Sequence, residues 1–162
     1  MTREGSVLYD VYVAGQAVNE MLLDGLGDAP LTPTEYAIYS AVFERDPATP
    51  SELSHALGMP AQTMSDWIAV MRERGHADTR RNPRDGRSQL VSLTDAGRCA
   101  HRRTNRSFEV VYRRFLDALA LPEDEARRLL SLIIAAARQA PGEANRQGAA
   151  STASRPASTP PK

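Results

Sequence analysis

Four arginines lie close together in the middle of the sequence, around a glycine-containing turn. They are Arg80, Arg81, Arg84 and Arg87. The dipeptide Asp85-Gly86 favours a tight hairpin, because Gly tolerates a positive φ and Asp bonds to nearby backbone amides. A projecting loop of guanidinium groups suits a phosphate backbone or a narrow DNA groove. For this stretch taken alone, a charged hairpin exposed to solvent is the alternative interpretation.

Charge is distributed unevenly along the chain. The formal net charge is +0 and the isoelectric point is about 6.8. Residues 1–71 hold two arginines against ten acidic residues, whereas residues 72–114 hold twelve arginines against five. The second segment has a basic electrostatic footprint that the neutral total conceals. Because Lys162 is the only lysine, cationic contacts depend on arginine, whose planar fork suits phosphate and guanine edges.

The 162 residues, 41% of them hydrophobic, suffice for one domain with its own core. A single cysteine, Cys99, rules out an internal disulfide and fits a reducing compartment. With no apolar signal core and no run near the roughly 18 apolar residues of a membrane span, a cytoplasmic location is expected. The small apolar neighbours of Cys99 predict a buried, inert thiol, and an oxidant sensor is the alternative. The histidines lack metal-ligand spacing, and no cofactor or metal is expected.

Helix signals precede the arginine cluster. Apolar spacing predicts an amphipathic helix over residues 6–26. The motifs Thr32-Pro33-Thr34-Glu35 and Thr49-Pro50-Ser51-Glu52 each combine a capping Thr, a Pro in the first turn and a Glu that closes a capping box. The first motif opens a helix whose inward residues are Tyr36, Ile38, Tyr39, Val42 and Phe43. The second opens a short helix that ends at Gly58.

A further helix over residues 60–74 completes a helix-turn-helix pattern. Its inward residues are Met64, Trp67, Ile68 and Met71. Its outer face carries small or hydrogen-bonding residues, which allow close approach to base edges. These are Ala61, Gln62, Thr63, Ser65, Asp66 and Ala69. Strands expected near Ala77–Arg81 and Gln89–Leu93 hold the arginine hairpin between them, which predicts a winged helix-turn-helix with the wing in a minor groove.

Two more helices are expected after the wing. Thr94 caps a long helix over residues 94–121, and Pro122 begins another that is apolar on more than one face. Such a helix needs a cover, and another subunit is the simplest candidate. After Ala140 the composition changes to Pro, Gly, Ala, Ser and Thr, which predicts a disordered tail over residues 141–162.

Several of these motifs together resemble the MarR family of bacterial transcriptional regulators over residues 31–97. The matching motifs are Leu31-Thr32-Pro33, Ser51-Glu52-Leu53, Thr63-Met64-Ser65, Arg74-Gly75 and, most specifically, Asp85-Gly86-Arg87 followed by Val91-Ser92-Leu93-Thr94-Asp95-Ala96-Gly97. The resemblance implies a homodimer on a pseudo-palindromic DNA site, and repression more often than activation. It implies that Arg87 enters the minor groove while the carboxylate of Asp85 holds its guanidinium.

The resemblance also defines the expected architecture. The fold class is mainly α with a small β wing: an N-terminal dimerisation helix (residues 1–30), a winged helix-turn-helix DNA-binding region (31–93), C-terminal dimerisation helices (94–140) and the tail. Family members often bind small aromatic or phenolic effectors between the winged domain and the dimer helices. The residues able to line such a crevice are Tyr9, Tyr12, Tyr36, Tyr39 and His101, although core packing explains the tyrosines equally well.

The leading hypothesis is a homodimeric, sequence-specific DNA-binding regulator, a repressor released by a small-molecule effector. The expected DNA-binding residues are Arg87, Arg84, Asp85, Gln62, Thr63, Ser65, Arg80 and Arg81. The alternative is a winged-helix protein-interaction module without sequence-specific DNA binding. The neutral net charge favours it, and so does Asp66, which stands where the family commonly has a basic residue and would repel phosphate. An enzyme is not expected, since no catalytic triad, metal cluster or phosphate-cradling loop occurs.

Overall fold

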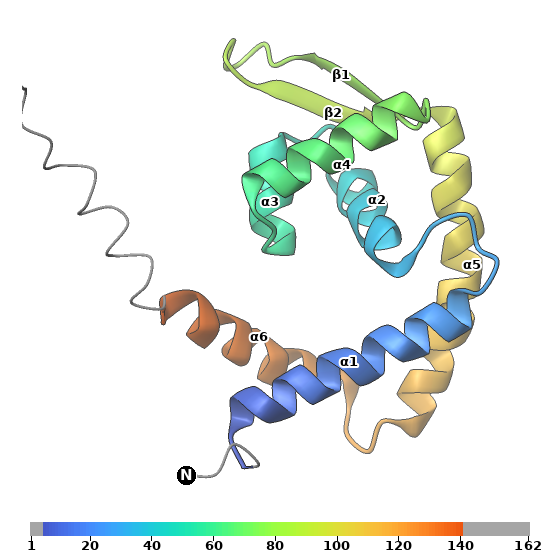
Figure 1. The fold of residues 1–162 in the computed structure, drawn as a ribbon, viewed down its shortest axis with the longest axis vertical. Coiled ribbons are helices and arrows are strands. Elements are labelled where there is room, and N and C mark those ends of the chain that lie inside the picture. The colour runs from blue at the N-terminus through green and yellow to red at the C-terminus, as the bar shows by residue number, and fades with distance from the viewer. Residues whose placement is uncertain (1–4, 141–162) are drawn as a thin grey trace, which may run out of the picture. The chain divides into compact units, whose positions relative to one another are not determined.

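The computed structural model describes residues 5–140, in which one β-hairpin follows the first four helices and precedes the last two (Figure 1). The elements in chain order are α1 (Val7–Leu26), α2 (Pro33–Arg45), α3 (Pro50–Leu57), α4 (Ala61–Glu73), β1 (Ala77–Arg81), β2 (Gln89–Leu93), α5 (Asp95–Ala118) and α6 (Glu123–Gln139). The chain divides into two compact units at Asp117, so that α6 is described by itself. The expected tail, residues 141–162, lies outside the described residues.

Both predicted capping boxes are present. The Thr32 hydroxyl accepts the amide of Glu35 at 3.3 Å, and Glu35 Oε2 accepts the amide of Thr32 at 2.8 Å. Thr49 and Glu52 repeat this exchange at 3.2 and 2.7 Å. Gly58 ends α3 with a φ of 63°, a left-handed conformation that Gly adopts without steric cost. These local bonds fix where α2 and α3 begin and where the turn before α4 lies.

The core lies between α2, α3, α4 and β2. Its fully buried side chains come from each of these elements and include Ile38, Tyr39, Leu53, Met64 and Val91. Phe43 does not follow the prediction: it is 42% exposed, although its neighbour Val42 is fully buried. Its ring stacks instead on His101 of α5, with centroids 4.7 Å apart.

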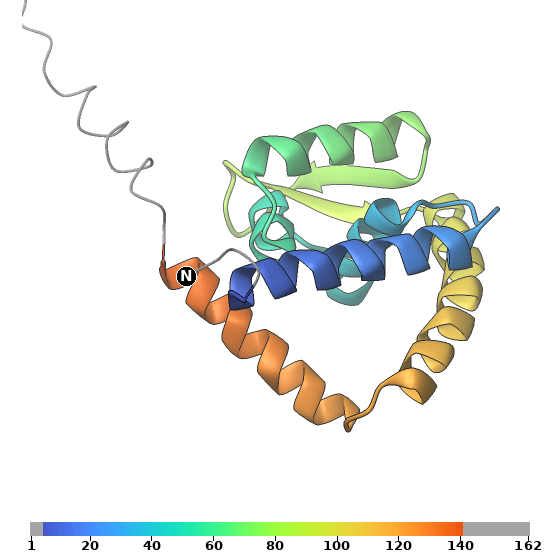
Figure 2. The ribbon, with the colours of Figure 1, turned by 60° about the horizontal axis from the view of Figure 1, so that its bottom comes forward.

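The wing is an antiparallel hairpin with the predicted strand bounds. Its register pairs Ala77 with Leu93 and Arg81 with Gln89. Ala48, ahead of α3, adds a bridge to Val91 through hydrogen bonds of 3.1 and 2.8 Å. The hairpin runs alongside α4, and its tip lies at the end away from α5 (Figures 1 and 2). The strands thus extend the turn away from the helices.

The end of α4 and the start of α5 meet at one junction. Gly75 takes a φ of 69° and turns the chain into β1. The Thr94 hydroxyl donates to the Gly75 carbonyl at 2.7 Å, and the Thr94 amide donates to the His76 carbonyl at 3.0 Å. A Cβ at Gly97 would stand 2.1 Å from the His76 carbonyl oxygen, so only Gly fits there. The motif that ends in Gly97 therefore brings α5 into backbone contact with the end of α4.

Two helices leave large apolar surfaces uncovered. Leu26 at the end of α1 is buried, but most of the helix is exposed, with Leu8 at 75%. No described residue of α6 is buried, and Leu130 is 57% exposed. Among residues 5–140, no helix combines the length and apolarity that crossing a membrane requires.

Candidate nucleic-acid interface

The outer face of α4 carries the polar residues that the sequence assigned to it. Gln62, Thr63 and Ser65 are all exposed, on the side away from the buried Met64 and Ile68. The Ser65 hydroxyl donates to the Ala61 carbonyl at 3.0 Å, which leaves the Ser65 oxygen free to accept a hydrogen bond. The three side chains are thus accessible on one side of α4, and their contact with DNA stays a prediction.

An ion pair holds the C-terminal end of α4. Arg74 Nη1 donates to Glu35 Oε1 at 2.6 Å, while the other carboxylate oxygen of Glu35 closes the capping box of α2. Glu35 is only 6% exposed. Burial by itself raises the pKa of Glu35, but the hydrogen bonds from Thr32 and Arg74 and the Arg74 charge outweigh it, so the pKa lies below its ordinary value. One buried carboxylate therefore ties α4 to α2.

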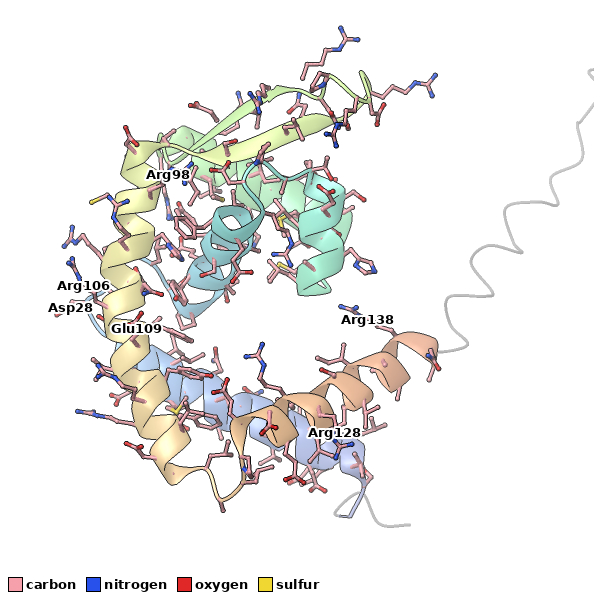
Figure 3. All side chains as sticks on the ribbon, turned by 180° about the vertical axis from the view of Figure 1, so that it is seen from behind. Asp28, Arg98, Arg106, Glu109, Arg128 and Arg138 are labelled. Carbon is pink, nitrogen blue, oxygen red and sulfur yellow. The ribbon has the colours of Figure 1, made fainter. Side chains whose placement is uncertain are left out.

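Hydrogen bonds to the backbone shape the wing tip. Asp85 Oδ1 accepts the amide of Arg87 at 3.1 Å, and Asn82 Oδ1 accepts the amide of Arg84 at 3.0 Å. The Arg81 Nε donates to the Gly86 carbonyl at 3.0 Å, so this guanidinium is folded back onto the turn. Arg84 and Arg87 are exposed, and Figure 3 shows nitrogen-tipped side chains projecting from the wing.

The structure gives Asp85 a different contact from the one that the resemblance implied. Its carboxylate accepts the main-chain amide of Arg87, and within residues 5–140 the ion pairs include neither of these two residues. Asp85 thus shapes the turn from which Arg87 projects.

The wing arginines fall into separate environments. Arg80 and Arg84 line one open cavity of about 450 Å³ beside Thr49 and Glu52 at the start of α3. Arg87 lines a second, of about 530 Å³, beside Ser51. The wing and the N-terminal turn of α3 therefore form a concave, arginine-lined surface in two parts.

The five residues expected to line an effector crevice are not brought together. Tyr36 and His101 stack with centroids 5.3 Å apart, but Tyr39 is buried elsewhere in the core, where its hydroxyl lies 2.9 Å from His76 Nδ1. Tyr9 and Tyr12 lie exposed on the first turns of α1. The prediction that these five residues line one crevice is therefore wrong for this chain. The first turns of α1, which carry Tyr9 and Tyr12, do not reach the other three residues, because α1 contacts the rest of its unit through its C-terminal end.

A column of aromatic rings joins α2 to α5, and sequence reasoning missed it. Phe43, His101, Tyr36 and Phe108 follow one another with centroid separations of 4.7, 5.3 and 4.8 Å. Next to Phe108, an apolar cavity of about 190 Å³ lies between α1 and α5. It is lined by Val18, Met21, Leu22, Phe108, Val111, Tyr112 and Phe115. The spacing of seven between His101 and Phe108 is the helical signal that would have placed both on one face of α5.

His101 is buried within this column. It is 6% exposed, and its Nε2 lies 3.0 Å from the Ser40 hydroxyl. Its Nδ1 has no hydrogen-bond partner among the described residues. Burial lowers the pKa of His101 below its ordinary value; the Glu44 carboxylate opposes this shift and the Arg102 charge adds to it. The folded protein therefore favours the neutral imidazole.

Cys99, near the start of α5, is exposed, so the prediction of a buried thiol is wrong. Its neighbour Ala100 takes the inward position. Arg98, labelled in Figure 3, pairs with Asp46 after α2 and lies 6.0 Å above the Phe43 ring. Within residues 5–140, no three His, Cys, Asp or Glu side chains lie close enough together to hold a metal ion.

Comparison with known proteins shows the same architecture in solved structures. The PcaV transcriptional regulator from Streptomyces coelicolor, solved with its natural ligand, is 24% identical with a TM-score of 0.70, over 85% of this chain and 96% of that one. A probable transcriptional regulator from Pseudomonas aeruginosa is 28% identical, with a TM-score of 0.66 over 81% and 98%. The M. tuberculosis regulator MOSR, solved with DNA, is 21% identical, with a TM-score of 0.70 over 82% and 97%. No curated protein sequence matches the chain significantly.

A helix-turn-helix followed directly by an antiparallel hairpin defines a winged-helix protein, and here long helices flank the winged part. The model of the MarR family matches residues 29–88, the segment that holds α2, α3, α4 and most of the wing. This match covers 60 of the 162 residues, and it shows that the segment is similar to the MarR family.

We predict that His101 makes stability depend on pH between about 7 and 5. Because the pKa of His101 is lower in the folded state than the unfolded value of about 6.5, the unfolded chain binds the proton first. The contribution of His101 to the free energy of unfolding is therefore fully present above about pH 6.5. It decreases as the pH falls, by at most about 1.4 kcal/mol per pH unit. Glu35, whose pKa is also lowered, acts only below about pH 4.5.

Urea denaturation at half-unit pH intervals measures this slope. His101→Phe keeps an aromatic ring in the column and removes the titration, so the slope between pH 7 and 5 should flatten. His55→Gln, at an exposed histidine of α3, is the matched control. An equal slope in the wild type and His101→Phe would show that another group is responsible.

Proposed function

We propose that this protein is a homodimeric, sequence-specific DNA-binding transcriptional regulator that acts as a repressor and is released by a small aromatic or phenolic effector. The observation that carries the proposal is the exposed hydrogen-bonding face of α4 together with the adjoining arginine-bearing wing. The fold likeness to MOSR, which was solved with DNA, supports it. Such a regulator acts where the DNA is, and we therefore also propose a cytoplasmic location.

In this proposal α4 lies in the major groove and the wing reaches a flanking minor groove. Gln62, Thr63 and Ser65 face base edges. Arg87 enters the minor groove, where narrow A·T-rich segments attract guanidinium groups. Arg80, Arg81 and Arg84 contact phosphates, while Asp85 keeps the turn in the shape that presents Arg87.

The uncovered apolar surfaces support the homodimer. Exposed apolar side chains on α1 and α6, such as Leu8 and Leu132, would be costly on an isolated chain in water. A second copy offers the same surfaces in return, as a two-fold interface requires. We propose residues 1–30 and 94–140 as the dimerisation segments.

The apolar cavity between α1 and α5 supports a small-molecule effector. Its lining is almost entirely apolar, and Phe108 continues it into the ring column that contains Tyr36. An apolar cavity lined by aromatic side chains suits the ring of a small aromatic compound. The structure of PcaV with its natural ligand is a parallel case in the same fold.

The alternative function is a winged-helix module that binds protein without reading DNA, as the neutral net charge and Asp66 favour. Salt dependence separates the two. Several phosphate contacts make affinity for DNA fall steeply as salt rises, whereas a protein-binding module shows no such DNA binding.

We predict that Arg87→Ala weakens DNA binding by about 1–3 kcal/mol, because it removes the guanidinium from the wing tip. The dissociation constant is measured by titrating a duplex selected from random DNA at several fixed salt concentrations. Arg113→Ala, on the later half of α5, is the control. Equal affinities of Arg87→Ala and the wild type would exclude this role.

A dimer of the 17.7 kDa chain is expected in sedimentation velocity at micromolar concentration. Leu132→Glu places a charge on the apolar surface of α6 and should shift the population towards the monomer. Thr34→Glu, at an exposed position of α2, should leave the dimer intact. A wild-type protein that sediments as a monomer throughout would contradict the proposal.

Effector binding should raise the melting temperature and release DNA. At 100 times its dissociation constant, a ligand specific for the folded state adds about 2.7 kcal/mol of stability. Benzoate, salicylate and 4-hydroxybenzoate are the probes, measured by thermal denaturation and by displacement of the selected duplex. Val18→Trp, which fills the cavity, should abolish both responses. The effector proposal fails if none of the three changes either measurement.

A further inference from the structure

Asp66, on the outer face of α4, takes no part in the DNA contacts proposed so far. Gln62, Asp66, Ala69 and Glu73 follow one another at helical spacing, directly opposite the buried stripe that contains Met64. All four are exposed. This outermost stripe of the helix carries two carboxylates and no cation. It is the part of α4 that would come closest to the floor of a major groove.

Asp66 has no cationic partner among residues 5–140. The Nε2 of Gln62 donates a hydrogen bond to Asp66 Oδ1 at 2.9 Å. The ion pairs formed within residues 5–140 do not include Asp66. A carboxylate that approaches DNA is repelled by the phosphates and weakens binding to any sequence. Such a group is compensated only where the DNA presents a hydrogen-bond donor to it.

Only certain bases present such a donor in the major groove. A carboxylate only accepts hydrogen bonds, and the donors in the groove are the N4 amino group of cytosine and the N6 amino group of adenine. Guanine presents two acceptors, and thymine presents one acceptor beside a methyl group. Adenine places its N7 acceptor next to N6, which repels a carboxylate. Cytosine is therefore the base that suits Asp66 best.

The amide of Gln62 keeps the groups that a contact to adenine requires. One N–H of its amide is committed to Asp66, which leaves the second N–H and Oε1 available. This pair of groups is what a bidentate contact to N7 and N6 of adenine needs. The bond to Asp66 also restricts the rotamers of Gln62 before DNA is bound, so less conformational entropy is lost on binding.

We propose that Asp66 is a specificity-determining residue of α4, which selects cytosine through its N4 amino group, rejects guanine, and orients Gln62 towards a neighbouring adenine. This inference rests on the proposed DNA-binding function. Affinity then comes from the wing arginines, and Asp66 lowers binding to every site that lacks a cytosine at its position.

Selection from random duplex DNA with the full chain tests the proposal. The proteins compared are the wild type, Asp66→Ala, Asp66→Asn and Gln62→Ala, with Asp28→Asn as a control for the loss of one negative charge outside α4. Each protein is then titrated at fixed salt against the wild-type consensus and its single-base substitutions. Circular dichroism melts verify that the variants are folded, as expected for exposed positions.

The wild type should enrich a cytosine whose replacement by guanine weakens binding by roughly 5-fold to 100-fold, the range of a good base contact. Asp66→Ala should reduce that ratio to below about threefold and bind random DNA more tightly, because a repulsion is lost. Asp66→Asn should accept guanine as well, since its amide also donates. Gln62→Ala should relax an adenine position and keep the cytosine, and Asp28→Asn should match the wild type.

Two failures are distinguishable. If the wild type enriches a site and Asp66→Ala enriches the same site with the same ratios, the role of Asp66 is overturned while the proposed function stands. If the wild type enriches no sequence and shows no salt-dependent binding, the proposed function fails, and the inference fails with it.

Discussion

The pair between Arg74 and Glu35 is the contact on which the geometry of the interface depends. It joins the last turn of α4 to the first turn of α2 at 2.6 Å, and the same carboxylate caps α2. At ~1.5 Å of rise per residue, Gln62 lies about 18 Å along the helix axis from that anchor. A small change of tilt at Arg74 would therefore displace the reading face considerably. A buried carboxylate with all of its contacts satisfied resists such a change.

A second attachment couples the same end of α4 to α5. Thr94 bonds to Gly75 and His76, and Gly97 lies against the His76 carbonyl without room for a Cβ. Because backbone meets backbone there, α5 cannot shift along the junction unless the turn after α4 shifts too. The aromatic column from Phe43 to Phe108 adds side-chain contacts between α2 and α5. A ligand beside Phe108 would thus act on a helix already connected to the end of α4.

Sequence reasoning succeeded where the determinants are local. The capping boxes at Thr32 and Thr49, the stop at Gly58 and the wing strands all follow from residues within a few positions of one another. It failed where partners are far apart in the chain: Glu35 with Arg74, Tyr36 with Asn105, and Phe43 with His101. Helical periodicity predicted that Phe43 and Cys99 are buried, but both are exposed. Periodicity shows which side of a helix is apolar, and it does not show which residues on that side are covered by other elements.

In this chain the positive charge and the outer face of α4 lie on different parts of the structure. Guanidinium groups, which bind phosphate without regard to sequence, lie on the wing and along α5, whereas the outermost stripe of α4 is acidic. The net charge of the chain is +0, so in the proposed function the attraction to phosphates comes from the basic segment and not from the chain as a whole. An acid on the reading helix lowers that attraction further and is compensated only at a matching base. In the role proposed above, Asp66, which would weaken binding as a phosphate contact, raises the ratio of specific to non-specific binding.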